Sequence, residues 1–446
     1  MTLNRSALST TLVRIQATFL MMVAGIFVTR LIGVRGRGIY AILLADIELL
    51  SLFFLGAVLP TGVVRFWGQG KIEDKVILGL AFWIALGTVL LGILFLVTDF
   101  GGAGNVLFPS QTVSYKPYVI FLFVLAVVNA LLMAFLQALN RIDILNAIVF
   151  FNAAASLVIY GSVFLFRNSL APYIGVKNVL IVSLLLNSVG CVVLIYNYSN
   201  LVGIWPTLFF PAGRDLKAFF NFLLIAHSAV LINFFNYRLD LWILERYRGL
   251  DDVGIYSLAV SLAQFIWLIP SALCVVLLPY FVNASKEDAT KALIFFSRVN
   301  FVIAVLLSLL GLACSGYIIP RLYGEAFTLS VVPFRILLFG IVAGSFTKIF
   351  AAYMAAKGRI LHNLMATTIG LIFTVVLDFT LIPRFGIAGA CIATCVSYLA
   401  IAASVYYSVV FRLREPVENY FFPTIAEVRQ LARRVEVMVR DKVHAP

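Results

Sequence analysis

Charged side chains are scarce in this sequence of 446 residues. Only 12% of the residues are Asp, Glu, Lys or Arg, whereas 63% are hydrophobic and the mean hydropathy is +1.05. A soluble domain carries about 25% charged residues, so a chain this apolar has too little polar surface to face water. The composition excludes a soluble globular protein and indicates a protein embedded in lipid.

Residues for catalysis and metal binding are also few. The three histidines are His227, His362 and His444, and no His-Glu-x-x-His zinc motif occurs. We find neither a Gly-x-x-x-x-Gly-Lys-Ser/Thr phosphate loop nor a convincing Ser-His-Asp arrangement. The five cysteines stand in apolar segments without partners at metal-ligand spacing, as small packed residues do. We therefore expect no enzyme, no cofactor and no metal, and any transport proceeds without nucleotide hydrolysis.

Long apolar segments make up most of the chain. A membrane-spanning helix needs about 20 mostly apolar residues, and twelve segments meet this requirement. The sequence therefore predicts an all-α polytopic membrane protein. The twelve predicted spans are 10–31, 38–59, 76–98, 117–139, 144–166, 178–199, 219–244, 254–279, 292–319, 329–353, 361–382 and 387–411.

Two short motifs each occur twice, and the two copies are separated by nearly the same number of residues. Gly38-Ile-Tyr returns as Gly254-Ile-Tyr after 216 positions, and Arg141-Ile returns as Arg359-Ile after 218 positions. The chain is about twice this length, which indicates two related halves. Internal repeats with a binding site at their interface are a common plan of secondary transporters.

A segment rich in proline and charge separates the two predicted halves. The predicted organisation is an N-terminal six-helix lobe over 1–205, a cytoplasmic linker over 206–218, a C-terminal six-helix lobe over 219–411 and a basic amphipathic cytoplasmic tail over 412–446. In the tail, Thr424 and Glu427 have capping-box spacing, and apolar residues follow one helical face. This pattern favours a helix lying on an anionic membrane surface, with a solvated terminal helix as the alternative.

Lysine and arginine in the loops predict the orientation. The two sides carry almost equal numbers until the tail adds seven, which favours cytoplasmic N- and C-termini in the inner (plasma) membrane. The net charge of +13 then fits anionic lipid headgroups, and no nucleic-acid-binding signature accompanies it. We expect some basic residues on the outer side to serve an anionic ligand. Those of the predicted turn over 31–38 and its edge are Arg30, Arg35 and Arg37.

Ionisable and polar side chains inside apolar spans are costly and typically face a cavity or a partner. Asn233 and Asn236 share one helical face, which Asp240 extends. Our candidates for a substrate cavity are Arg14, Asn233, Asn236, Arg238, Asp240 and Gln264. Our candidates for ion coupling or gating are Asp46, Glu48, His227 and Asp378.

Structural roles are the alternatives for several of these residues. Arg14 has a stem long enough to extend to the inner headgroups. Arg238 and Asp240 are close enough in sequence to form an internal structural pair near the outer interface. His227 fits a packed, hydrogen-bonded histidine as well as a proton relay.

Five motifs in order carry a resemblance to a known family. They are Arg30-Leu-Ile-Gly33 followed by Arg37-Gly-Ile-Tyr40, Asp240-Leu-Trp-Ile-Leu244 followed by Val253-Gly-Ile-Tyr256, Leu322-Tyr-Gly324-Glu-Ala-Phe327, Ala356-Lys-Gly-Arg359 and Ile382-Pro-Arg-Phe-Gly386-Ile-Ala-Gly389-Ala390. Together they resemble polysaccharide and O-antigen flippases of the Wzx type, in the superfamily that also contains lipid II flippases and MATE drug exporters. The resemblance covers about residues 10 to 411.

The resemblance implies two pseudo-symmetric six-helix lobes that form a V around a cationic central cavity. It implies that a polyprenyl-diphosphate-linked oligosaccharide moves from the cytoplasmic to the outer leaflet, by alternating access, for surface polysaccharide biosynthesis. Arg14 stands where related lipid II flippases also carry an arginine in span one. Their arginines in spans two and eight are not matched, because Asp46 and Glu48 lie in span two and Gln264 in span eight. The absence of an extra C-terminal pair of spans favours the polysaccharide branch.

Partners and alternatives follow from the same resemblance. The expected partners are the lipid-linked substrate, membrane lipids, a coupling H⁺ or Na⁺, and glycosyltransferase or polymerase enzymes, but no nucleic acid. One alternative is a MATE-like, cation-coupled exporter of small organic cations, for which Asp46, Glu48 or Asp378 would matter most. Another is a non-transporting scaffold of a polysaccharide synthase complex that binds its partners through the tail.

Overall fold

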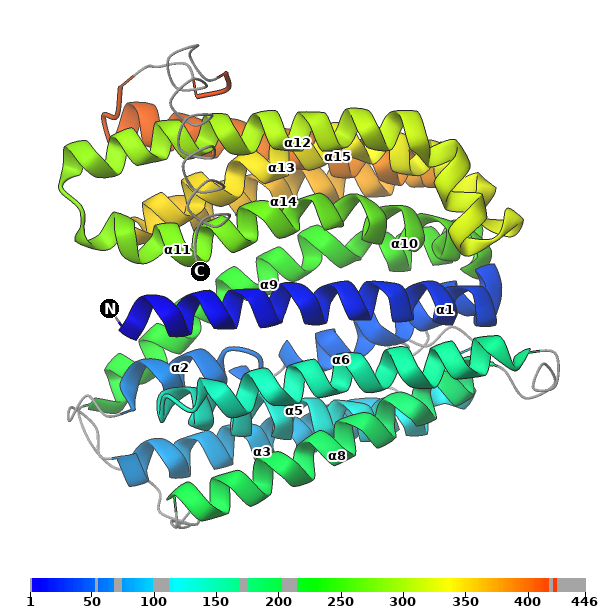
Figure 1. Cartoon of the computed structure of the whole chain (residues 1–446), viewed down its shortest axis with the longest axis horizontal. Coiled ribbons are helices and arrows are strands. Elements are labelled where there is room, and N and C mark those ends of the chain that lie inside the picture. The colour runs from blue at the N-terminus through cyan, green and yellow to red at the C-terminus, as the bar shows by residue number, and fades with distance from the viewer. Residues whose placement is uncertain are drawn as a thin grey trace, which may run out of the picture. The chain divides into compact units, whose positions relative to one another are not determined.

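The computed structural model describes residues 2–52, 55–67, 74–98, 112–167, 175–202, 215–416 and 420–422. All regular structure in these segments is helical, as predicted (Figure 1). The predicted linker over 206–218 lies mostly outside the described residues, and the predicted tail helix after Thr424 lies wholly outside them.

Long helices follow one another with short connections. In chain order they are α1 (Thr2–Leu52), α2 (Leu59–Phe66), α3 (Asp74–Thr98), α5 (Lys116–Ala138), α6 (Ile142–Leu165), α8 (Val176–Val202), α9 (Asp215–Arg248), α10 (Leu250–Gln264), α11 (Leu268–Asn283), α12 (Lys286–Tyr323), α13 (Val331–Ala356), α14 (Ile360–Phe385) and α15 (Ile387–Tyr407). Short 3₁₀ turns cover Val113–Tyr115, Phe265–Trp267 and Glu325–Ser330, and one π-helical turn covers Ser408–Arg412. Eleven helical stretches of the described chain are long and apolar enough to cross a membrane.

One of these eleven stretches counts as two spans. It runs over Val13–Leu52, and 40 continuous helical residues would extend about 60 Å, twice the thickness of a bilayer core. Gly33 interrupts it with φ 69° and ψ −173°, a conformation that glycine adopts readily. The predicted hairpin is therefore present, but its turn is shorter than the expected 31–38. Arg35 and Arg37 lie on helix instead of in a loop.

The backbone repeats itself at the distances found in the sequence. Gly33 and Gly249, 216 positions apart, both have positive φ, 69° and 86°. Asn140 and Gly358, 218 positions apart, have φ values of 58° and 70°. After each of the latter two, the next residue's N–H donates to the carbonyl five positions earlier, at 2.9 and 2.8 Å, so both helices end in the same C-capping turn. The repeat therefore extends from sequence motifs to helix ends.

By contacts, the chain forms two compact units. The first comprises 1–258 with 317–331 and 375–390, and the second comprises 259–316, 332–374 and the chain from 391 onward. These units do not follow the predicted boundary at 206–218, since α9 and the first part of α10 belong to the first unit. The division into two six-helix lobes in chain order stays a prediction.

The first unit is held together by helix pairs of small and branched apolar residues. α1 packs along α6, and α5 packs along α8. One buried cluster joins Ala24 and Val28 of α1 to Tyr160 of α6 and Val179 of α8. Small residues at such contacts let helices approach closely, which matters in lipid because no hydrophobic force drives helices together there.

Hydrogen bonds stabilise the second unit at several places. The Trp267 indole N–H donates to the Ile341 carbonyl at 3.0 Å. Ser285 caps α12, because its Oγ accepts the backbone N–H of Asp288 at 3.1 Å. Glu415, which follows the last helical turn, is only 5% exposed and accepts hydrogen bonds from Thr290 and Tyr353 at 2.7 Å each.

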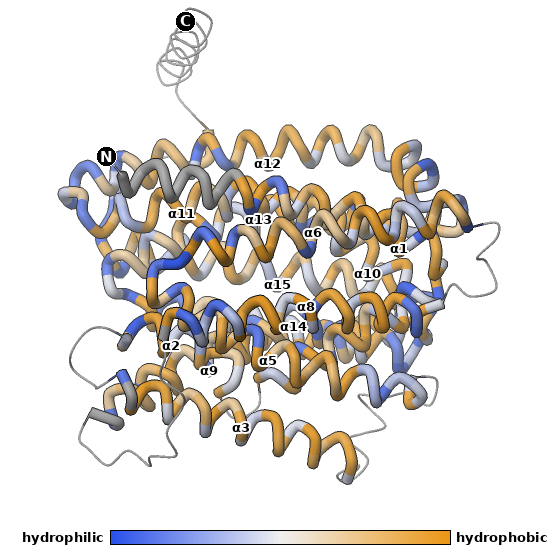
Figure 2. Tube along the Cα trace, turned by 60° about the horizontal axis from the view of Figure 1, so that its bottom comes forward, coloured by the Kyte–Doolittle hydropathy of each residue, from blue (hydrophilic) through white to orange (hydrophobic). Residues whose placement is uncertain are grey.

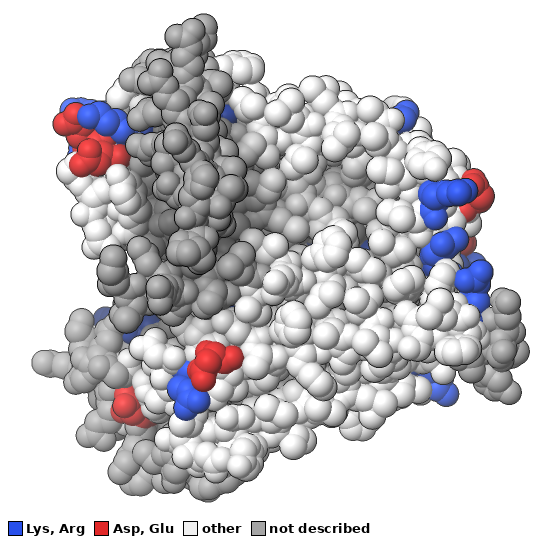
Figure 3. All heavy atoms as spheres, in the orientation of Figure 1, with Lys and Arg blue, Asp and Glu red and all other residues white. Residues whose placement is uncertain are grey.

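The helices present an apolar surface to their surroundings. Hydrophobic residues make up most of each helix, and hydrophilic residues gather near the helix ends (Figure 2). On the face drawn in Figure 3, charged side chains lie near helix ends and leave an uncharged surface between them. Large apolar side chains such as Leu165 and Phe339 are 79% and 69% exposed, which fits contact with acyl chains. None of the five cysteines forms a disulfide; Cys191, Cys391 and Cys395 are buried, and Cys274 and Cys314 are partly buried.

Candidate functional site

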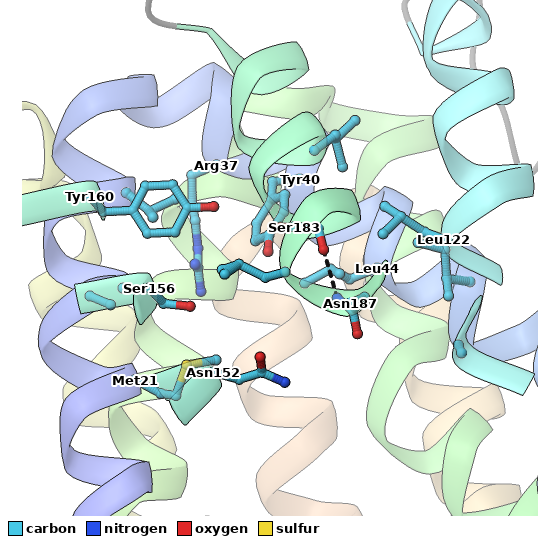
Figure 4. A pocket seen from close by; sticks show the side chains of 17 residues that line it. Met21, Arg37, Tyr40, Leu44, Leu122, Asn152, Ser156, Tyr160, Ser183 and Asn187 are labelled. Carbon is cyan, nitrogen blue, oxygen red and sulfur yellow. Dashed lines mark hydrogen bonds between the residues drawn. The ribbon is translucent and has the colours of Figure 1, made fainter. Parts of the chain in front are cut away.

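A cavity of about 420 Å³ lies inside the first unit, among α1, α5, α6 and α8 (Figure 4). This volume is within the range of about 300–1,000 Å³ that is usual for small-molecule sites. Its wall is mainly apolar, with Met21, Leu44 and Leu122 among the lining side chains. The polar side chains that interrupt this wall are Arg37, Tyr40, Asn152, Ser156, Tyr160, Ser183 and Asn187.

Of the residues that the structure describes, Arg37 is the single charged one that lines this cavity. It belongs to the part of α1 after the break at Gly33, and its side chain extends into the cavity beside Tyr160 and Tyr40 (Figure 4). The sequence placed Arg37 in an outer turn together with Arg30 and Arg35, so its position on a cavity wall is a finding of the structure. A partly buried guanidinium in a mainly apolar wall creates a strong attraction for an anion.

Hydroxyl and amide groups surround the guanidinium. The Tyr160 hydroxyl donates to the Val179 carbonyl at 3.3 Å, and Tyr40 and Ser183 lie beside it (Figure 4). Within α8, the Asn187 amide N–H donates to the Ser183 backbone carbonyl at 2.8 Å. Asn152 places its Oδ1 in a buried position with no hydrogen-bond partner among the described residues. The cavity thus offers both donors and acceptors for a polar ligand.

A second cavity of about 460 Å³ adjoins the first. The two cavities share the lining residues Leu44, Ile47 and Ala126, so together they follow the second segment of α1. Polar side chains of the second cavity come from α1 and α9 and are Glu48, Ser51, Asn233 and Tyr237. We call the two adjoining cavities the polar track. The track holds two of the predicted residues, Asn233 and Glu48.

The carboxylate of the second cavity is already paired. Arg238 Nε donates to Glu48 Oε2 at 3.1 Å, with side chains 38% and 51% exposed. Arg238 is also within electrostatic range of Arg37. The structure therefore joins Arg238 to Glu48, not to Asp240 as the alternative interpretation of the sequence supposed.

Asp46 lies away from the polar track. It is fully buried, and its Oδ1 accepts a hydrogen bond from the indole N–H of Trp242 at 3.0 Å. Asp46 and Glu48 point in different directions, as their spacing of two on a helix requires. This contact joins the second segment of α1 to α9.

A second acidic position lies in the same unit, between α9 and α14. Asp240 and Asp378 are 5% and 1% exposed, and their carboxylates are close enough to interact electrostatically. The Tyr256 hydroxyl donates to Asp240 Oδ2. Neither carboxylate oxygen of Asp378 has a hydrogen-bond partner among the described residues. A buried carboxylate without such a partner is costly and is a marker of function.

The remaining predicted residues line neither cavity. Arg14 is exposed on α1, Asn236 is buried on α9, and Gln264 is partly buried at the end of α10. His227 is half-buried, and its Nδ1 has no hydrogen-bond partner among the described residues.

Two of the basic residues near Gly33 make contacts outside the track. Arg30 lies over the Phe164 ring, 5.3 Å from its centroid. Arg35 is exposed and pairs with Asp251 at 3.4 Å, across 216 positions. Of the three arginines grouped together in the sequence, the cavity therefore receives Arg37 alone.

Most residues of the cavity wall were not predicted from the sequence. Asn152, Ser156 and Tyr160 follow one another at intervals of four on α6, and Ser183 and Asn187 do the same on α8. Such spacing places polar groups on one face of an otherwise apolar helix. This pattern was available in the sequence as a signal, although each residue is uncharged and unremarkable alone.

Comparisons with known proteins give structural matches only. No protein-family model and no curated protein sequence matches the chain. Among solved structures, the lipid II flippase MurJ in an inward closed conformation matches with a TM-score of 0.69 and 13% identity, over 97% of this chain and 100% of that one. An inward-facing multidrug resistance MATE family transporter of the MOP superfamily matches with a TM-score of 0.67 and 16% identity, over 91% and 98%. The MATE transporter ClbM in complex with Rb⁺ matches with a TM-score of 0.54 and 14% identity, over 90% and 93%. The chain therefore has the fold of these MOP superfamily proteins.

Proposed function

We propose that this chain is a flippase that moves a polyprenyl-diphosphate-linked oligosaccharide from the cytoplasmic to the outer leaflet of the cell membrane, with both termini in the cytoplasm. The fold shared with a lipid II flippase and with MATE transporters supports transport. The observation that carries the choice of substrate is the charge of the polar track. Within the described part of the chain, the charged residues that line it are Arg37 and Glu48, and Glu48 is paired with Arg238.

This arrangement of charges stabilises an anionic lipid head group better than a cationic one. Moving one bare ion from water into a medium of low dielectric costs of order 20 kcal/mol, so a diphosphate needs cationic and hydrogen-bonding partners on its way. Arginine matches phosphate oxygens with a planar, bidentate fork. The hydroxyl and amide groups of the track suit sugar hydroxyls, and the prenyl chain remains in the bilayer while the head crosses.

An organic-cation exporter fits the track less well. A cationic drug requires a carboxylate that faces the cavity, but Asp46 is turned toward Trp242 and Glu48 is paired with Arg238. A scaffold without transport activity does not account for a polar track inside a membrane protein, since buried polar groups are retained at a cost.

The buried acids of the first unit supply a second element of the proposal, a coupling site. One proton or one monovalent cation between Asp240 and Asp378 would relieve the repulsion of two neighbouring carboxylates. The solved Rb⁺ complex of ClbM, a MATE transporter with the same fold, supports monovalent-cation binding as a feature that this fold accommodates. In this account, the ion gradient drives return of the empty carrier.

Removal of the gene tests the proposed function. Cells without the protein are expected to accumulate a prenyl-diphosphate-linked oligosaccharide on the inner leaflet and to lose the corresponding surface polysaccharide. The accumulated lipid is identified by mass spectrometry, and a plasmid copy of the wild-type gene serves as the control. Unchanged lipid-linked sugars, together with increased sensitivity to organic cations, would favour the exporter instead.

A further inference from the structure

We infer that the chain after α15 forms a latch that restrains transport by tying three helices of the second unit together at one end. The latch consists of Glu415, Tyr420, Phe421 and Phe422, which the sequence placed in the C-terminal tail. Its seat is formed by Thr290 and Phe301 of α12, Phe346, Phe350 and Tyr353 of α13, and Tyr406 of α15. The inference goes beyond the proposed function, because it concerns regulation and not the substrate.

The chain reverses its direction directly after the last helix. A π-helical turn over Ser408–Arg412 follows α15, and the Glu415 N–H donates to the Val409 carbonyl at 3.3 Å. Arg414 has a φ of 57°, in the left-handed region that residues other than glycine rarely adopt. Such a conformation costs free energy and persists only where the surroundings hold it. The reversal at Arg414 is therefore maintained by the contacts that follow it.

A buried carboxylate ties the latch to the ends of two helices. Glu415 is buried, and its carboxylate accepts hydrogen bonds from Thr290 and Tyr353 at 2.7 Å each. Thr290 lies one turn after the start of α12, and Tyr353 lies one turn before the end of α13. Among the ion pairs of the described chain, none includes Glu415. Because a buried carboxylate that depends on neutral donors is costly to retain, loss of either donor is expected to favour release of the latch.

Aromatic rings hold the returning chain against the helices. The Tyr420 ring is fully buried and packs against Phe350 of α13 and Tyr406 of α15, with ring centroids 5.2 and 6.0 Å apart. Its hydroxyl donates to the Pro416 carbonyl at 3.0 Å, which ties the ring to the start of the latch. Edge-to-face ring pairs of this kind stabilise a contact beyond the area that they bury.

Phe421 and Phe422 extend the contact further along the helices. Phe421 stacks on Phe346 with ring centroids 5.1 Å apart and an interplanar angle of 15°. Both latch rings meet Phe301 edge-on, at centroid distances of 5.2 and 5.6 Å. At 1.5 Å per helical residue, Phe301 lies about 16 Å beyond Thr290 on α12. The latch therefore runs back along the helices of the second unit.

The docked latch opposes movement of these helices. It contacts α12, α13 and α15 together, so a change in their spacing at this end breaks ring contacts or a hydrogen bond to Glu415. Strain at Arg414 and the buried carboxylate oppose docking, whereas ring packing favours it, so the latch is a two-state element. In the proposed orientation this end faces the cytoplasm, where the substrate is loaded. Docking thus lowers the rate at which the second unit changes conformation for loading.

Hydrogen exchange of the purified full-length protein tests docking without a substrate. Mass spectrometry follows the backbone amides of the peptide that contains the latch in the wild type, Thr290→Val, Tyr353→Phe and Tyr407→Phe. The first two variants each remove one donor to Glu415, and Tyr407→Phe is the matched control because the ring contact of Tyr407 is with Phe411. We expect exchange to be about threefold faster or more in Thr290→Val and Tyr353→Phe, and unchanged in Tyr407→Phe. Equal exchange in all four proteins would overturn the inference.

Translocation into vesicles tests the restraint itself. The probes are a fluorescent prenyl-diphosphate-linked saccharide and, in parallel, an organic cation, so the comparison holds for whichever probe the wild type moves. At matched protein levels we expect the initial rate to rise about two- to fivefold in Tyr353→Phe and to stay unchanged in Tyr407→Phe. Thr290→Val replaces Tyr353→Phe in this comparison if the latter does not fold. A rate equal to or below that of the wild type, in a variant whose latch exchanges faster, would overturn the restraint.

Failure of this inference is separable from failure of the proposed function. A chain that moves the saccharide lipid at the same rate in Tyr353→Phe and the wild type retains the function and loses the restraint. A chain that moves only the organic cation, and moves it faster in Tyr353→Phe, retains the restraint and loses the function.

Discussion

Gly38 of α1 and Gly254 of α10 contact each other's helices in the same way, 216 positions apart. A Cβ atom at Gly38 would overlap the carbonyl oxygen of Leu250, and one at Gly254 would overlap that of Val34, the residue equivalent to Leu250 in the repeat. The two helices therefore meet backbone to backbone through equivalent residues. The motif that revealed the repeat in the sequence is the motif that this contact requires.

Alanine at Gly38 tests this close contact. The added methyl meets backbone, which cannot turn away as a side chain can, so Gly38→Ala is expected to destabilise the protein by about 1–3 kcal/mol or more. The thermal unfolding temperature in detergent measures the effect. Gly87→Ala is the control, because a Cβ at Gly87 in α3 meets nothing within 4 Å and alanine favours a helix by roughly 1 kcal/mol. An unfolding temperature for Gly38→Ala equal to or above that of the wild type would contradict the contact.

The Asp46–Trp242 hydrogen bond predicts a structural role for Asp46. Trp242→Phe removes the donor and leaves a buried carboxylate without this partner, which is expected to cost about 1–3 kcal/mol. Asp46→Asn keeps an oxygen that accepts the indole N–H, so it should retain both stability and transport. Unfolding temperatures of the single and double variants give the coupling between the two residues. Transport lost in a stable Asp46→Asn protein would return Asp46 to the coupling role predicted from the sequence.

The Arg238–Glu48 pair separates an anionic substrate from a cationic one. The pair is partly exposed, so breaking it should change stability by no more than about 1 kcal/mol. The variants differ in the charge that remains at the pair. Arg238→Gln leaves the negative charge of Glu48, Glu48→Gln leaves the positive charge of Arg238, and the double variant leaves no charge. For an anionic head we expect transport to fall about 3- to 10-fold in Arg238→Gln, from a Coulomb energy of order 1 kcal/mol.

The other two variants complete this comparison. Glu48→Gln should transport an anionic head at least as well as the wild type, and the double variant should recover most of the loss. Initial rates of translocation at matched protein levels provide the measurement. The reverse order among the three variants would indicate a cationic substrate.

The buried carboxylate of Asp378 predicts opposite effects on stability and transport. Asp378→Asn removes one of two neighbouring buried acids, so the unfolding temperature should stay equal or rise. Transport driven by an ion gradient should fall at least tenfold, because the proposed coupling ion loses a ligand. Vesicles with an imposed Na⁺ or pH gradient measure this dependence. A variant that responds to both gradients as the wild type does would exclude Asp378 from coupling.

Much of the fold was predictable because lipid imposes simple rules. Long apolar segments must form helices, since the backbone finds no other hydrogen-bond partners in a bilayer. The hairpin at Gly33 was found from its glycines, although its turn is confined to one residue and not spread over 31–38. The predicted second span is also shorter than expected: α1 ends at Leu52, and α2 begins at Leu59.

The site was less predictable. A charged residue in an apolar segment indicates a special role, but it does not show which cavity or partner the side chain faces. Glu48 and Asn233 were identified as site candidates and line the track. Arg37 was identified as a basic residue of a turn, and its cavity could not be foreseen without the packing of α6 and α8 around it. Tyr160 carries no charge, so only its place opposite Arg37 gives it a role.

The central claim is that the polar track carries an anionic, lipid-linked head across the membrane. Translocation in vesicles that contain the purified protein tests it most directly, with a fluorescent prenyl-diphosphate-linked saccharide and an organic cation compared in parallel. The account predicts that the saccharide lipid crosses at least tenfold faster than in protein-free vesicles, that Arg37→Gln returns it to the protein-free rate, and that the cation is not moved. Movement of the organic cation, with the saccharide lipid at the protein-free rate, would contradict the account.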